Sequence, residues 1–171
     1  LFLVTFVHGY AQRGEPVRVL ELSASGYERA HALAFSADGN QLAIGGTSGI
    51  YLFDTQQFSK PLFFQTKVWA RSVVFLPQNN VLAGGLFDNT VTFWNINNTQ
   101  PLKILNEPKG WVRSLSVSGD GSLLAAASDD DVIRIWQTSN DKLTLVLNDV
   151  QGVRVTALSP DGSLVAGALA A

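Results

Sequence analysis

The sequence repeats a short pattern at a nearly constant interval, and this repeat constrains the fold more than any other feature. Each copy consists of an apolar residue, a polar turn and a short apolar strand. The copies span residues 35–46, 75–85, 117–128 and 158–168. The equivalent turn residues are Gly39, Asn79, Gly121 and Gly162. They are 40, 42 and 41 residues apart. A repeat of about 40 to 45 residues built from short strands is typical of the blades of a β-propeller.

The residues of each repeat predict four strands. Three of the turns contain an Asp-Gly pair, which fits the positive-φ positions of a tight hairpin, and Asn79-Asn80 replaces it in the second copy. A third strand rich in β-branched and aromatic residues and a weaker fourth strand follow each hairpin. These strands are expected at 49–54, 61–65, 90–95, 101–105, 132–137 and 142–147. No segment shows sustained helical periodicity, so the sequence predicts an all-β chain.

The repeats resemble those of the WD-repeat β-propeller family. The family's F-S-P-D-G-x-x-L-A run is similar to residues 158–166 and 35–43, and its S-x-D-x-T-I-R-L-W-D run is similar to residues 128–137 and 86–95. Members of the family close rings of about four to eight blades. The resemblance therefore implies four-stranded antiparallel blades in an open or incomplete ring, with the remaining blades expected elsewhere in the same protein. The blades are expected at about residues 29–65, 69–105 and 111–147, with part of a fourth at 153–168.

The chain departs from the family pattern in two respects. The Trp-Asp pair of the family is replaced by Phe53-Asp54, Trp94-Asn95 and Trp136-Gln137, and its Gly-His pair is absent. In the family, that histidine joins a hydrogen-bond chain with a turn aspartate, a serine and the tryptophan. Without the histidine, we expect the matching aspartates, Asp88 and Asp130, to cap N–H groups of their turns.

Residues 1–14 have two interpretations. The apolar LFLVTFV followed by HGYAQ matches the end of a secretory signal and its cleavage site, but its composition also suits a strand. A signal remnant would favour an extracytoplasmic location, and its absence a cytoplasmic one. Residues 15–22 predict an outer strand, which in the family often completes the last blade. The partial propeller is therefore expected to span residues 15–171.

Composition excludes several kinds of site. The chain has no cysteine and two histidines, which excludes disulfides and thiolate sites and argues against a histidine metal site. The net charge of −2 gives no general attraction to nucleic acid or anionic membranes, and the N-terminal apolar run is too short to span a bilayer. The acidic run 128–131 suits a solvated turn or, alternatively, a calcium ion. We expect no catalytic, cofactor-binding or metal-binding residues in this chain.

One position of the repeat carries a set of cations. A triplet leads into the innermost strand of each blade, and its third residues are His31, Arg71, Arg113 and Arg154. Three of the triplets begin with Arg29, Trp69 and Trp111. In the family these positions lie on one face near the central channel, so the resemblance implies that the side chains converge. Guanidinium groups bind carboxylates and stack on aromatic rings.

The sequence thus predicts a non-catalytic scaffold that binds a protein or peptide with an acidic surface. The candidate contact residues are Arg29, His31, Trp69, Arg71, Trp111, Arg113 and Arg154. The competing interpretation gives the arginines a structural role, on a solvated rim or paired with acidic residues. Two further alternatives are a propeller enzyme whose catalytic residues lie in other blades and a sensor domain fused to a kinase or peptidase.

Overall fold

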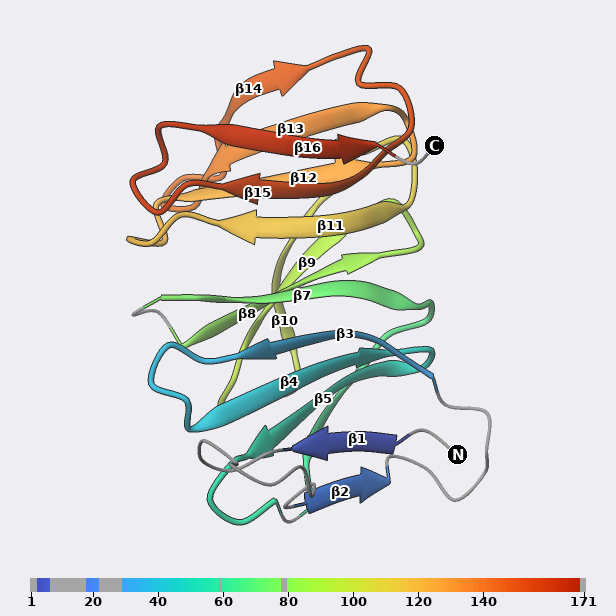
Figure 1. Cartoon of the computed structure of the whole chain (residues 1–171), viewed down its shortest axis with the longest axis vertical. Helices are drawn as coiled ribbons and strands as arrows, with labels where there is room; N and C mark the ends of the chain where they lie inside the picture. Colours follow the sequence, from blue (N-terminus) through green and yellow to red (C-terminus); the bar gives the residue numbers. More distant parts are fainter. Residues whose placement is uncertain (1–2, 7–17, 22–28, 59, 78–79, 170–171) are drawn as a thin grey trace, which may run out of the picture.

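The computed structural model describes residues 3–6, 18–21, 29–58, 60–77 and 80–169. Within these ranges the regular secondary structure consists of β-strands alone. The strands form three four-stranded and two two-stranded antiparallel sheets (Figure 1). A search of the same residues found no helix long and apolar enough to cross a membrane. The predicted all-β architecture is confirmed.

The four-stranded sheets are the predicted blades, and in each the strands are hydrogen-bonded in chain order. The first blade contains β3 (Ala30–Phe35), β4 (Gln41–Gly46), β5 (Gly49–Asp54) and β6 (Leu62–Gln65). The second contains β7 (Ala70–Leu76), β8 (Val81–Leu86), β9 (Val91–Asn95) and β10 (Pro101–Leu105). The third contains β11 (Val112–Val117), β12 (Leu123–Ser128), β13 (Val132–Gln137) and β14 (Leu143–Leu147). The partial fourth blade pairs β15 (Val153–Leu158) with β16 (Val165–Leu169).

The N-terminal strands form a separate pair. β1 (Leu3–Phe6) is antiparallel to β2 (Arg18–Glu21). β1 lies within the predicted leader of residues 1–14, and β2 lies within the predicted outer strand of residues 15–22. The rest of both segments falls outside the described residues, so the leader and the blade-completing strand stay predictions.

The hairpin turns have the chemistry that their sequence predicts. Gly121 and Gly162 adopt φ values of 75° and 71°, which residues with a side chain rarely adopt. In the third blade, the Asp120 carboxylate accepts hydrogen bonds from the Ser118 hydroxyl and from the backbone N–H of Ser122. These bonds, the Ser118 hydroxyl first, lower the pKa of Asp120 from 3.8 to about 2. The turn is therefore held by an ionised aspartate.

The expected capping of turn N–H groups is confirmed for Asp88, whereas Asp130 binds a backbone N–H of another loop. Asp88 accepts hydrogen bonds from the backbone N–H and the hydroxyl of Thr90. Asp130 accepts one from the backbone N–H of Lys109, at 2.8 Å. The indole Nε1 of Trp136 is buried and has no hydrogen-bond partner. The hydrogen-bond chain of the family therefore does not reach this tryptophan.

Adjacent blades are joined through their innermost strands, β3, β7, β11 and β15, which follow one another along the arc (Figure 1). The Ser72 hydroxyl accepts a hydrogen bond from the Leu115 N–H at 2.9 Å, and the Ser114 hydroxyl accepts one from the Thr156 N–H at 3.1 Å. A Cβ at Gly85 would lie 2.6 Å from Cγ1 of Val112 in the next blade. The spacing between blades is therefore fixed in two ways: by serine hydroxyls that bond to the next blade, and by the close approach of the Gly85 backbone to Val112.

Both ends of the arc expose apolar surface. Val73 and Leu115 face the preceding blade and are 4% and 6% exposed, whereas the equivalent Leu33 of the first blade is 55% exposed. At the other end, Leu169 on β16 is 60% exposed, although its equivalent Leu86 is 4% exposed. The predicted open ring is confirmed, because the first and last faces have the residues of a blade interface but no neighbouring blade among the described residues.

Candidate functional site

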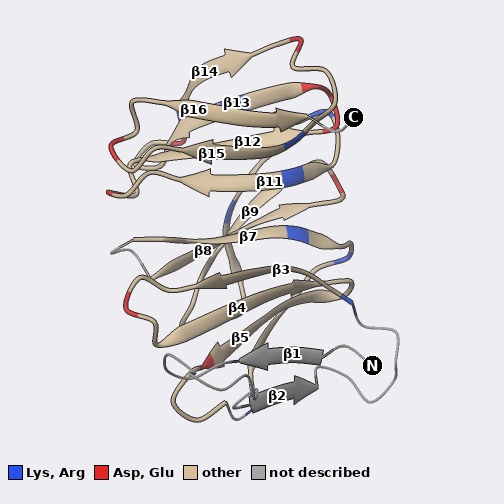
Figure 2. Ribbon diagram, viewed as in Figure 1, with Lys and Arg blue, Asp and Glu red and all other residues tan. Residues whose placement is uncertain are grey.

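The predicted cationic position lies at the same end of four adjacent strands. His31, Arg71, Arg113 and Arg154 are each the second residue of an innermost strand, in β3, β7, β11 and β15. Figure 2 shows the basic residues of β7 and β11 at corresponding ends of the two neighbouring strands. The repeat therefore brings together residues that are about 40 positions apart in the chain.

Four rings form a continuous stack across three blades, which we call the aromatic stack: His31, Trp69, Phe87 and Trp111. The ring centroids of His31 and Trp69 are 5.1 Å apart, and those of Trp69 and Phe87 are also 5.1 Å apart. Phe87 and Trp111 lie closer, at 4.3 Å, with their planes 13° apart. Trp69 and Trp111 are 42% and 45% exposed, so the stack is accessible from solvent.

Two guanidinium groups lie against this stack. Cζ of Arg71 is 5.7 Å from the centroid of Phe87, and Cζ of Arg113 is 5.2 Å from the same ring and 5.3 Å from Trp111. Distances below about 6 Å allow a cation–π attraction. Arg71 also donates a hydrogen bond from Nη1 to Nδ1 of His31, at 3.1 Å. Because a guanidinium has no acceptor, this bond requires Nδ1 of His31 to be unprotonated.

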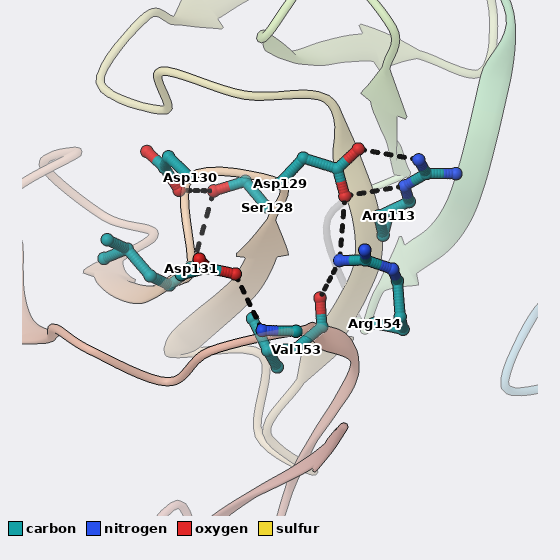
Figure 3. Close-up of polar contacts among 9 residues, drawn as sticks. Arg113, Ser128, Asp129, Asp130, Asp131, Val153 and Arg154 are labelled. Atoms are coloured by element: carbon teal, nitrogen blue, oxygen red, sulfur yellow. Dashed lines mark hydrogen bonds and ion pairs between the residues drawn. The ribbon is translucent and has the colours of Figure 1, made fainter. Parts of the chain in front are cut away.

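A single carboxylate holds the other two arginines together (Figure 3). Asp129 accepts bonds from Nε and Nη2 of Arg113, at 2.8 and 2.6 Å, and lies 3.1 Å from Nη1 of Arg154. The hydrogen bond from Arg113 lowers the pKa of Asp129, and the charge of Arg154 lowers it further. The same hydrogen bond raises the pKa of Arg113. This carboxylate offsets the repulsion that converging arginines otherwise experience.

The rest of the acidic run is used within the fold. Burial raises the pKa of Asp130, but bonds from Arg134, Ser128 and Lys109 outweigh burial and lower it overall. Oδ1 of Asp131 accepts a hydrogen bond from the backbone N–H of Gly152, at 2.8 Å. A search of the described residues found no group of three side chains that could hold a metal ion. These contacts support the interpretation of the run as a turn.

Sequence reasoning missed Phe87 and Asp129, which carry the contacts between blades. Both occupy the first position after the second strand of their blade, as does Thr47 in the first blade. Thr47 accepts a hydrogen bond from the backbone N–H of Arg29, at 3.4 Å. The signal that could have found them was the repeat phase, because Phe87 lies 40 residues after Thr47 and 42 before Asp129.

A shallow cavity adjoins the aromatic stack. It has a volume of about 310 Å³ and is lined by Thr47, Lys67, Val68, Trp69, Phe87 and Trp111. A larger cavity of about 390 Å³ lies near the Asp38 turn, between the first two blades, and contains none of the predicted site residues. The smaller cavity is the better candidate, because exposed tryptophans and a lysine converge on it.

Comparisons with known proteins agree with this architecture. Residues 99–137 match the family model described as "WD domain, G-beta repeat". A chain in the structure described as "Crystal Structure of Mitotic Checkpoint Complex" superposes with a TM-score of 0.79 and 19% sequence identity, over 89% of this chain. The match covers 48% of that chain, so the present chain spans about half its length. A search of curated proteins found no match. The chain is a β-propeller arc with three complete blades and part of a fourth, and its segment 99–137 is similar to a WD repeat.

Proposed function

We propose that the chain binds a protein or peptide partner at the aromatic stack and the cavity beside it, and that this role is non-catalytic. WD-repeat propellers generally act as protein-interaction scaffolds. The observation that carries the proposal is the pair of exposed tryptophans, Trp69 and Trp111, on the rim of one cavity. Tryptophan and arginine are among the residues enriched at the energetic centres of interfaces.

Charge supports an acidic partner. Lys67 lines the cavity, and Arg71, Arg113 and Arg154 lie on the neighbouring strands. Asp129 is the one acidic side chain that forms ion pairs with these arginines in the described part of the chain. A partner with a negative surface therefore gains attraction at this face, and the attraction weakens as salt is added.

The predicted contact residues divide into two groups. Trp69, Trp111 and Arg71 carry the partner-binding proposal, with Arg29 and His31 beside them at the first blade. Arg113 and Arg154 are held by Asp129, which supports the structural role that the sequence left as an alternative. The apolar faces at the two ends of the arc fit further blades of the same protein.

A peptide selection tests the proposal. Random peptides displayed on phage are selected on the chain after depletion on a Trp69→Ser/Trp111→Ser variant, and their affinities are measured by calorimetry. We expect peptides rich in Asp, Glu and aromatic residues, whose affinity falls at least about tenfold in each single Ser variant, about 1.4 kcal/mol. Affinity should also fall between about 50 and about 500 mM NaCl.

The matched control is Leu145→Ser, because Leu145 is 44% exposed but lies on the outer strand β14. It should leave the affinity unchanged. Peptides that bind the double variant as tightly as the unmodified chain, or with no dependence on salt, would contradict the proposal.

A further inference from the structure

The position that neutralises Arg113 in the third blade is not acidic in the second. Asp129 follows β12 and binds Arg113 of the same blade through two hydrogen bonds. The equivalent residue after β8 is Phe87, whose ring lies against Arg71 without offering an acceptor oxygen. Arg71 therefore occupies the same repeat position as Arg113 without a carboxylate of its own.

The donors of Arg71 are incompletely used. Nη1 bonds to His31, and Nε is buried without a hydrogen-bond partner. A buried donor left unpaired is energetically unfavourable, because it has lost its hydrogen bonds to water without replacing them. Arg71 forms no ion pair within the described ranges. In the same ranges Asp129 is the one carboxylate that forms ion pairs with the neighbouring arginines, and it pairs with Arg113 and Arg154. The three arginines therefore keep an excess of positive charge over the one carboxylate. Arg71 is the one of the three that has no ion pair in the described part of the chain.

We infer that Arg71 is the binding position for one carboxylate of the partner, which binds beside Trp69 and Phe87 as Asp129 binds Arg113. The inference rests on the proposed function and names the ligand chemistry: a carboxylate flanked by apolar groups. Asp129 shows the binding mode, since its oxygens bond to Nε and Nη2 of one guanidinium. The same edge of Arg71 includes the unpaired Nε, which is buried in the free chain, so the Arg71 side chain has to reorient for the partner's carboxylate to reach it. Apolar neighbours of the carboxylate then contact the exposed rings of the aromatic stack.

The carboxylate has two chemical sources, an acidic side chain or the C-terminus of a peptide. Three fluorescein-labelled heptapeptides separate them. The first has glutamate between two phenylalanines and an amidated C-terminus. The second replaces the glutamate by glutamine, and the third is the glutamine peptide with a free C-terminus. Binding is measured by fluorescence anisotropy at low salt, and near-UV circular dichroism checks that each variant is folded.

We expect the chain to bind the glutamate peptide at least about tenfold more tightly than the amidated glutamine peptide. Arg71→Gln should remove this preference. The matched control Lys142→Gln, which removes the same charge at an exposed site before β14, should keep it. Asp129→Asn should tighten the binding of the glutamate peptide, because it releases Arg113 and Arg154. If the third peptide binds like the first, the C-terminus is an equally good source.

A second variant keeps the test decisive if Arg71→Gln is poorly folded. Phe87→Asp places a carboxylate where Asp129 stands in the third blade and should also remove the glutamate preference. Equal binding of the first two peptides by the unmodified chain, or a preference that survives in Arg71→Gln or Phe87→Asp, would overturn the inference.

The two proposals fail separately. Selected peptides that need Trp69 and Trp111 but tolerate Arg71→Gln would leave the proposed function in place and refute the carboxylate site. A selection in which no peptide depends on the tryptophans would refute the proposed function itself.

Discussion

The ion pairs of Asp129 give the sharpest test of the structural part of the site. Asp129→Asn keeps the volume of the side chain but removes the charge that Arg113 and Arg154 share. Hydrogen bonds to charged groups contribute about 1.5–3 kcal/mol. The side chains of Arg113 and Asp129 are 21% and 22% exposed, so their pair retains much of this range. Arg154 is 42% exposed and adds little, because solvent screens its attraction.

We therefore expect Asp129→Asn to lower the free energy of unfolding by about 2 kcal/mol at neutral pH. For a chain of this length, that corresponds to a decrease in Tm of about 4–8 °C. Urea denaturation followed by circular dichroism measures the free energy, and differential scanning calorimetry measures Tm. Added NaCl should narrow the difference, because it screens the repulsion among the remaining arginines.

The pH dependence has a defined sign. The folded state holds the pKa of Asp129 below its ordinary value of 3.8, so the unfolded chain binds the proton first as pH falls. The stabilisation is therefore complete above about pH 5 and declines progressively below about pH 4. The unmodified chain and Asp129→Asn should thus become more similar in stability as the solution is acidified.

The matched control is Asp149→Asn, an exposed residue whose φ of 59° asparagine adopts readily. It should change stability by less than about 0.5 kcal/mol. The reasoning is refuted if Asp129→Asn is as stable as the unmodified chain at neutral pH, or if the difference between them grows at low pH.

Three further predictions concern the fold that positions the site. Ser114→Ala should lower the free energy of unfolding by about 1 kcal/mol and speed amide hydrogen exchange at Thr156, because the bridge between the third and fourth blades is lost; unchanged exchange would argue against the bridge. Gly85→Ala should cost about 1–3 kcal/mol in urea denaturation, because the new Cβ would lie 2.6 Å from the next blade, and a neutral result would contradict this packing. NMR titration should give Asp161 a pKa of about 2, and Ser159→Ala should move that pKa back toward 3.8, because the Ser159 hydroxyl is its main hydrogen-bond donor; an unmoved pKa would show that the turn is held otherwise.

The repeat phase was sufficient to predict the blades. Turn residues such as Gly121, with the β-branched and aromatic runs that follow, predicted strands that the structure places within one or two residues. The triplet alignment also placed His31, Arg71, Arg113 and Arg154 correctly at equivalent positions. Local turn chemistry and the alternation of strands determine these features, and both can be read from one sequence.

The contacts within the site could not be predicted in the same way. Phe87 and Asp129 contact residues of two blades, and these contacts depend on how far and in which direction each side chain extends from its turn. Arg71, Arg113 and Arg154 look equivalent in the alignment, yet two of them share a carboxylate and the third does not. The difference arises from one repeat position, which holds a phenylalanine in one blade and an aspartate in the next.

The central claim is that four rings from three blades, His31, Trp69, Phe87 and Trp111, meet on one face as a continuous aromatic stack. Nuclear Overhauser contacts between assigned ring protons test this claim directly. With centroids 5.1 and 4.3 Å apart, the Phe87 ring should show contacts to Trp69 within its blade and to Trp111 in the next blade. The same contacts should persist in Arg71→Gln, because that residue lies beside the rings and not between them. Absence of contacts between Phe87 and Trp111 in the folded chain would contradict the account.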